Sequence, residues 1–546
     1  MDGEMPQAGI GAAMDRLTPT MSRRAVLAVA GGVALAGILG SCSNDNATVP
    51  AGSGSGTAAT DVLVAAVGSF ATETVDPHVA PNNSNLRPVM WAISETLARR
   101  DLDGKLVPNL ALSWETSSDA LTWTFTLRPG VMMQDGSTFA GRDVKTAIDR
   151  VTMNPEFTYF AQLRESLEAV NVLGDGRVSV KLKKPYPTIL DELPVPIPTA
   201  YYEQVGNAEF GKRPLGAGAF KFVSQQIHGS VTMERFDGYF DKSRMPNFKT
   251  LKMLIIPDES ARIAGLLNGQ IDIAHGLSAN SVKQLEGAPN IRVLRKDNAS
   301  FGAVNFQDLY FPDRPSPFLD VRVRKALIYA LDRQSMVTSL YQGYATVVAN
   351  FTLPITLGND ASLAPYPYDP QRAKQLLADA GAENLTFDFR SYTVDNVQPN
   401  VQRLSQAMVG YWAQIGAKVN YQAVDNAVVL AQHRAHTLTG IRIGGWPANV
   451  FYKANYSAHN TLYGAGFSTS VRDPALDAII DRLDAATDSG REESIANEYS
   501  RYVYDNVPIF PVLGFPSLVG IGPKVRDFQL QAGNPYLGPF WSLQAA

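Results

Sequence analysis

The sequence predicts an α/β fold built from more than one substructure, and three observations lead there. The chain has 546 residues, and chains of this length usually fold around more than one hydrophobic core. Hydrophobic residues make up 45% and charged residues 18%, the balance of a foldable globular chain. Segments with strand and helix patterns interleave along the chain without an internal repeat, which favours α/β layers.

Short apolar segments predict strands. Residues 62–67 form a β-branched apolar run typical of a buried strand. Residues 121–127 alternate strictly between apolar and polar side chains, which indicates a half-buried strand that ends at Arg128-Pro129-Gly130. Gly216-Ala217-Gly218 lacks the third glycine of a dinucleotide fingerprint and is interpreted as a tight turn before a strand at 219–222.

Three later segments have the pattern of helices. Asp320 precedes the first of them, residues 321–341, in which Leu327, Ala330 and Leu331 recur at helical spacing. The other two begin at Asp-Pro pairs, which combine a capping carboxylate with the residue preferred in the first turn. These pairs are Asp369-Pro370, whose helix ends before Gly381, and Asp473-Pro474, which precedes Leu476, Ile479, Ile480 and Leu483.

The first sixty residues have the pattern of an exported lipoprotein. Arg23 and Arg24 precede an uncharged apolar run, residues 25–41, as a basic region precedes the apolar core of a signal peptide. The arginine pair partly matches the twin-arginine consensus, so both export routes stay open. Leu39-Gly40-Ser41-Cys42 has the form of a bacterial lipobox, which predicts a lipid on Cys42, the one cysteine of the chain. Residues 43–60 are small and polar, and predict a flexible tether.

The charge and the motif content give no support to several functions. The net charge of -4 gives no basic footprint for a nucleic acid. No phosphate loop, nucleophile elbow or zinc-binding H-E-x-x-H helix is present, so the sequence gives no specific reason to propose an enzyme, a cofactor or a metal. His433 and His436 are spaced for one helical face, but they lack a third metal ligand. We interpret both as residues of a helix surface.

Trp446 is the aromatic residue with the strongest indication of a binding role. It lies between Gly445 and Pro447, directly after an apolar run at 441–443, so we expect it on a turn at a strand end. An aromatic ring in that place can cover a ligand. Local sequence leaves ligand contact and core packing equally open.

Several blocks in a fixed order resemble the family 5 extracellular solute-binding proteins of ABC importers, whose members bind oligopeptides, dipeptides or nickel. The resemblance covers nearly the whole chain after the tether. The blocks are Glu95–Leu97, Leu106–Trp114, Thr122–Phe125, Leu127–Val131, Asp135-Gly136, Asp143-Val144, Gly216–Phe222, Asn268–Ile273, Asp320–Ala326, Ala330–Arg333, Tyr368–Pro370, Leu376-Leu377, Gly445-Trp446 and Pro508–Pro511.

The resemblance implies two α/β lobes hinged about a ligand cleft, with a smaller insert on the first lobe. Lobe closure around a ligand is the hinge motion that this architecture allows. The expected organisation is an export signal at 1–41, a lipidated tether at 42–60, lobe I at 61–95, 201–297 and 513–546, the insert at 96–200 and lobe II at 298–512. The implied partners are permease subunits and a small solute, and we expect a monomer on the outer face of the cytoplasmic membrane.

The resemblance also suggests ligand-binding residues. In peptide binders, an aspartate three residues after the Gly-Trp tryptophan pairs with the free ammonium of the ligand. Here that residue is Asn449, which carries no charge, so Asp395, Asp425 or another acid would have to substitute. A charge-assisted hydrogen bond contributes about 1.5–3 kcal/mol, against roughly 1 kcal/mol for a neutral one. The candidates are Phe70, Tyr392, Asp395, Gly445, Trp446 and Asn449.

The predicted function is capture of a peptide or peptide-like solute for an importer, without catalysis. Haem, a metal chelate, an oligosaccharide or a modified peptide such as glutathione are alternative ligands. An exported hydrolase or a lipoprotein adhesin that uses the same fold are alternatives of another class.

Overall fold

The computed structural model describes residues 61–69, 74–79, 87–352, 354, 356–393, 398–448, 454–466, 468–486, 489–532, 534 and 540. The predicted signal, the lipobox and the tether lie outside these residues. Among the residues that are described, no helix combines the length and the apolar character needed to cross a membrane.

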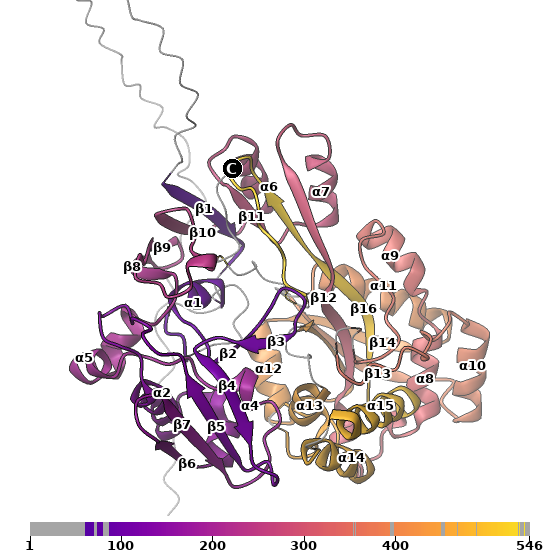
Figure 1. Cartoon of the computed structure of the whole chain (residues 1–546). Coiled ribbons are helices and arrows are strands. Elements are labelled where there is room, and N and C mark those ends of the chain that lie inside the picture. The colour runs from indigo at the N-terminus through magenta and orange to yellow at the C-terminus, as the bar shows by residue number, and fades with distance from the viewer. Residues whose placement is uncertain are drawn as a thin grey trace, which may run out of the picture. The chain divides into compact units, whose positions relative to one another are not determined.

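One sheet of ten strands contains most of the described strand residues (Figure 1). In sheet order the strands are β14 (Lys418–Val424), β13 (Thr386–Tyr392), β15 (Ile441–Pro447), β12 (Arg292–Phe306), β16 (Ile509–Ile521), β11 (Ile273–His275), β1 (Val62–Val67), β10 (Thr250–Ile255), β9 (Ser230–Arg235) and β8 (Phe220–Gln226).

The two longest strands, β12 and β16, connect two hydrophobic cores. Residues 292–296 of β12 pair antiparallel with 517–521 of β16, and residues 300–305 pair with 509–515. The register shifts between Lys296 and Ser300, where Asn298 has a φ of +50°. Such an irregularity increases local twist and bends a strand. The two strands therefore run from one core into the other through a break in their ladder.

The core around β1 and β8–β10 is the first-lobe core. The β1 run pairs in parallel with β10 and β11, so its apolar side chains are covered on both faces, as such runs require. Leu63 and Ala65 have no exposed surface. The C-terminal part of the chain contributes side chains to this core, namely Val519, Ile521, Val525, Phe528, Leu530 and Phe540. Helices of this part are α1 (Arg87–Ile93), α6 (Glu259–Leu267) and α7 (Ala279–Leu285).

The core around β12, β13 and β15 is the second-lobe core, and it draws on residues 301–515. Trp412 is fully buried there, and its indole N–H donates to the carbonyl of Leu327 at 2.9 Å. The helices that surround these strands in Figure 1 are α8 (Val321–Tyr329), α9 (Arg333–Tyr341), α10 (Pro370–Asp379), α11 (Val401–Gln414), α12 (Asn426–Arg434), α13 (Ala454–Ser457), α14 (Pro474–Asp484) and α15 (Ser489–Asn506).

The Asp-Pro helices form as predicted. Asp369 caps α10 by accepting from the N–H of Arg372 at 2.8 Å, and Gly381 follows the helix with a φ of +65°. In α14 the buried residues are the four apolar ones named from the sequence.

The prediction of a single helix over 321–341 is wrong. The chain forms α8 and α9, separated at residues 330–332. Asp332 accepts a hydrogen bond from the N–H of Ser335 at 2.9 Å and so caps a second helix. The hydrogen bond to the Asp332 side chain replaces a backbone hydrogen bond that one continuous helix would need. The spacing of apolar residues alone does not reveal this competition.

Residues 97–217 build a third core on a separate four-stranded sheet. Its strands, in sheet order, are β4 (Ala111–Thr116), β5 (Thr122–Leu127), β7 (Arg177–Leu182) and β6 (Leu167–Val172); two short strands, β2 (Ala98–Arg100) and β3 (Leu106–Pro108), pair beside it. Its helices are α2 (Gly141–Met153), α3 (Ala161–Ser166), α4 (Ile189–Glu192) and α5 (Thr199–Lys212). The α/β fold class is confirmed, while the exact domain boundaries stay a prediction.

Candidate functional site

Trp446 packs against two phenylalanine rings of the second lobe, one on the neighbouring strand β12 and one in a loop. The register of β12 and β15 places Phe301 opposite Trp446, and their rings stack with centroids 6.1 Å apart and planes 15° apart. Phe351 meets the indole edge-on at 5.8 Å. Phe301 and Phe351 are fully buried, whereas Trp446 is half-buried. The indole is therefore held by a rigid apolar support and keeps some accessible surface.

The expectation that Trp446 lies on a turn is wrong. Strand β15 continues through the two glycines to Pro447, because residues 444–447 pair with residues 300–303 of β12. Pairing with β12 keeps these residues in a strand, although the local Gly-Gly-Trp-Pro sequence is typical of a turn.

Arg442 shares the sheet face of Trp446, since the two residues are four apart on one strand. The guanidinium carbon lies 5.5 Å from the centroid of the indole. Nη1 donates a hydrogen bond to the hydroxyl of Tyr392 at the end of β13. The glycine between them allows this approach, because a Cβ on Gly444 would lie 3.2 Å from both Arg442 Nη1 and the Trp446 ring. The result is a cation packed beside an aromatic face.

The structure brings together three of the six ligand-binding candidates. Trp446, Gly445 and Tyr392 lie on adjacent strands, and Tyr392 is buried. Phe70, Asp395 and Asn449 lie outside the described residues, as does Cys42. Asp425 is exposed and accepts from the N–H of Ala427 at 2.9 Å, so its carboxylate caps α12.

Sequence reasoning missed Arg442 and Phe301. The signal available for Arg442 was its even spacing from Trp446 along one strand, which places both side chains on one face. Phe301 carried no local signal, because its position depends on the pairing of strands about 140 residues apart in the chain.

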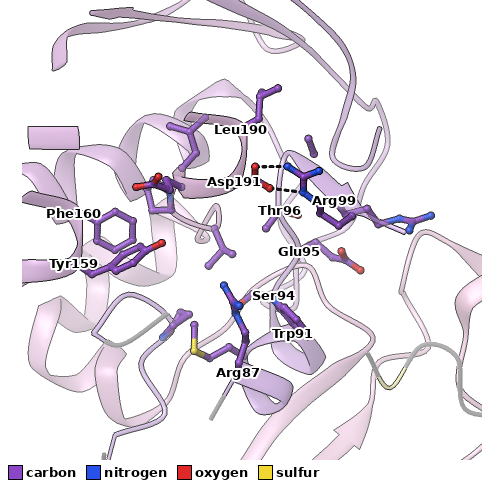
Figure 2. Close-up of a pocket in the computed structure, with 18 of the residues that line it drawn as sticks. Arg87, Trp91, Ser94, Glu95, Thr96, Arg99, Tyr159, Phe160, Leu190 and Asp191 are labelled. Atoms are coloured by element: carbon purple, nitrogen blue, oxygen red, sulfur yellow. Dashed lines mark hydrogen bonds and ion pairs between the residues drawn. The ribbon is translucent and has the colours of Figure 1, made fainter. Parts of the chain in front are cut away.

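A separate cavity of about 150 Å³ lies beside α1. Figure 2 shows Tyr159 and Phe160 on one side of it and Thr96 and Glu95 on the other. Arg100 and Asp191 form an ion pair at 2.5 Å on its wall. None of the predicted ligand-binding residues that the structure describes lines this cavity.

Glu192 lines the same cavity with a buried carboxyl group. The hydroxyl of Tyr186 donates to one carboxyl oxygen of Glu192. Burial in this low-dielectric place raises the pKa of Glu192 to about 7. The carboxyl group therefore holds its proton to a higher pH than an exposed glutamate does.

A closed network of buried charges lies near this cavity. Arg150 forms an ion pair with Asp76 at 2.5 Å, and its Nη1 lies 2.9 Å from Nδ1 of His78. The other imidazole nitrogen of His78 lies 2.9 Å from the carbonyl oxygen of Val195. Burial, then the charge of Arg150, lowers the pKa of His78 to about 4. This network joins the segment 74–79 to α2.

The interpretation of His433 as a surface residue is wrong. His433 is fully buried on α12, with Nδ1 2.8 Å from Gln307 Oε1 and Nε2 2.9 Å from the carbonyl oxygen of Ser468. Burial lowers its pKa to about 3. His436 follows the helix end with a φ of +52°. In the described part of the chain, no group of three or more His, Cys, Asp or Glu is placed to hold a metal ion.

Comparison with known proteins identifies the family. The profile of the bacterial extracellular solute-binding proteins, family 5 (middle), matches residues 105–468. The glutathione-binding protein GsiB of Pectobacterium atrosepticum is 30% identical over 402 residues, 72% of this chain and 75% of that protein. Heme-binding protein A of Haemophilus influenzae is 27% identical over 454 residues, 77% of this chain and 81% of that protein.

The fold is also shared with solved structures. The dipeptide-binding protein of Pseudoalteromonas sp. SM9913, solved in complex with Met-Leu, aligns with a TM-score of 0.76 over 89% of this chain and 100% of that chain, at 19% identity. This likeness confirms the two-lobed periplasmic-binding architecture. The chain belongs to the family 5 extracellular solute-binding proteins, the binding components of ABC importers.

Proposed function

We propose that this protein captures a peptide or peptide-like solute at the face that carries Trp446 and delivers it to the permease of an ABC importer. The observation that carries the proposal is the half-buried indole held on Phe301 and Phe351, with the Arg442 guanidinium beside it. Aromatic rings with a few fixed polar groups are the usual composition of a solute site. One relative is named for glutathione, itself a tripeptide derivative.

The proposal includes the position of the protein in the cell and its state. We infer that Cys42 carries a lipid that anchors a monomer to the outer face of the cytoplasmic membrane, and that the protein binds solute without turning it over. The lipobox and the membership in an extracellular binding family support this. Mass spectrometry of the mature N-terminal peptide tests the lipid, and a constant ligand mass after incubation with peptides tests the absence of turnover.

Native mass spectrometry of the protein as purified, followed by thermal shift with a library of short peptides, tests the ligand class. We expect some peptides to raise the melting temperature, because a ligand that binds only the folded state stabilises it. A shift with haemin and none with any peptide would favour the second candidate, a non-peptide solute, to which the heme-binding relative points.

Trp446→Ala tests the site. We expect the affinity for the identified solute to fall by roughly 10-fold or more, since stacking on a supported ring contributes on the order of 1–2 kcal/mol, with little loss of folded protein. Trp114→Ala is the matched control, because Trp114 is also partly buried but belongs to the third core. Global unfolding of the Trp446 variant at normal temperature would instead assign the ring to the core.

Asn449→Asp tests whether a peptide amino terminus meets position 449. If it does, the added charge should strengthen binding of free-amino peptides over their N-acetylated forms by about 10-fold, as expected for a charge-assisted hydrogen bond. Equal affinity of the two peptide forms for the variant would remove position 449 from the proposed amino-terminal site.

A further inference from the structure

Six arginine side chains are buried in the described part of the chain, and five of them are compensated. A buried guanidinium is costly unless carboxylates or several hydrogen-bond acceptors surround it. The six are Arg150, Arg244, Arg262, Arg324, Arg333 and Arg442.

Two of the five compensated arginines have carboxylate partners. Arg150 meets Asp76 at 2.5 Å, and Arg244 meets Asp241 at 2.7 Å. The other three, Arg262, Arg324 and Arg333, each donate to at least three backbone carbonyl oxygens. Their charges are satisfied within the protein, which is the usual condition for burying an arginine.

Arg442 differs from all five. Its one hydrogen-bond partner among the described residues is the Tyr392 hydroxyl. Its Nε has no partner among them, as is also true of Arg262, but Arg262 donates to three carbonyl oxygens through its other two nitrogens. No carboxylate oxygen of a described residue lies within 4.0 Å of it. On the adjacent strand, Asn305 lies opposite Arg442, fully buried, with both its amide oxygen and its amide nitrogen unpartnered. The face beside Trp446 thus keeps one positive charge and several open hydrogen-bonding atoms.

We propose that Arg442 is a specificity residue that receives a carboxylate group of the solute. The inference rests on the proposed function, because it specifies which solutes bind at the same site. A guanidinium presents a planar pair of donors that matches a carboxylate, and the neighbouring amide of Asn305 offers a further donor. Trp446 then packs against the part of the solute next to that carboxylate. The solute class is a carboxylate-bearing peptide or peptide-like acid.

The first test compares acids with their amides. Short peptides with a free C-terminal carboxylate and the same peptides as C-terminal amides are titrated by calorimetry into the full-length mature protein. We expect the wild type to bind the acids at least about 10-fold more tightly. In Arg442→Gln this preference disappears, while binding of the amides changes little. Equal binding of acids and amides by the wild type, or a preference retained in Arg442→Gln, overturns the proposal.

The second test needs no ligand. Removing an uncompensated buried charge should stabilise the ligand-free protein, so Arg442→Gln should raise the melting temperature by about 2 °C. The matched variant Arg333→Gln, which leaves buried carbonyl groups without donors, should lower it. If both variants lower the melting temperature alike, Arg442 is a structural arginine and the proposal fails.

The two tests also separate this inference from the proposed function. If no peptide acid or amide binds, the peptide proposal fails on its own. The inference about Arg442 is then decided with succinate and citrate: a thermal shift in the wild type that Arg442→Gln abolishes supports it, and equal shifts in both proteins overturn it.

Discussion

The buried charges at Asp76 and at Arg442 follow different rules. Beside α2, Asp76 and Arg150 neutralise each other, with side chains 4% and 1% exposed. In the second lobe, Arg442 is as deeply buried but faces an aromatic ring and a hydroxyl group. The first arrangement is complete within the protein and stabilises the fold. The second leaves polar atoms without partners among the described residues, which is the property that the proposed solute site requires.

The largest effect should come from breaking the closed network. Asp76→Asn leaves Arg150 buried without its counter-charge, so we expect unfolding by urea to show a loss of about 3–5 kcal/mol. Asp149→Asn is the control, since Asp149 pairs with Lys145 on an exposed helix surface and should change stability by less than about 0.5 kcal/mol. Similar losses in the two variants would show that the ion pair of Asp76 and Arg150 does not stabilise the fold more than a surface pair does.

A second effect should depend on pH. The pKa of Glu192 is raised from its ordinary value of 4.5 to about 7 by burial. Between these two pH values the unfolded chain has released the proton and the folded protein still holds it, so this group makes stability fall as the pH rises. Glu192→Gln should therefore stabilise the protein by about 2–3 kcal/mol at about pH 8, and leave it unchanged at about pH 4.

Urea unfolding of the wild type and the Glu192 variant at both pH values checks this. Glu168→Gln serves as the control, because Glu168 pairs with Lys181 at the surface with an exposed side chain. A stability difference between wild type and Glu192→Gln that does not vary with pH would show that the pKa of Glu192 is not raised in the folded protein.

The smallest effect should fall on the open site. Gly444→Ala places a methyl group 3.2 Å from Arg442 Nη1 and from the Trp446 ring, so the two side chains must separate slightly. We expect solute affinity to fall a few-fold, and stability to change by about 1 kcal/mol or less. The comparison variant is Gly410→Ala on α11, where a Cβ meets nothing within 4 Å. Alanine favours the helix more than glycine does, so this variant should gain up to about 1 kcal/mol of stability. Unchanged affinity in Gly444→Ala would show that close packing of Arg442 and Trp446 does not matter for binding.

The Asp-Pro helices and the buried strand β1 were predictable because their determinants are local. A capping carboxylate, a proline in the first turn and a terminating glycine act within a few residues. The break between α8 and α9 shows the limit of apolar periodicity, because Asp332 starts a second helix inside an unbroken apolar pattern. His433 shows another limit, since its burial depends on Gln307 and Ser468, which are distant in the sequence.

The sequence by itself determined the α/β class, the capped helices and the family, and it singled out Trp446 as a candidate binding residue. These depend on composition, short-range spacing and ordered blocks of residues, all of which are present in the linear chain. Tertiary structure alone decided that Trp446 lies inside a strand and packs on Phe301 and Phe351, and that Arg442 beside it has no carboxylate partner among the residues that the structure describes. Those properties arise from pairing between β12, β13 and β15, which brings together residues that carry no information about one another until the sheet forms.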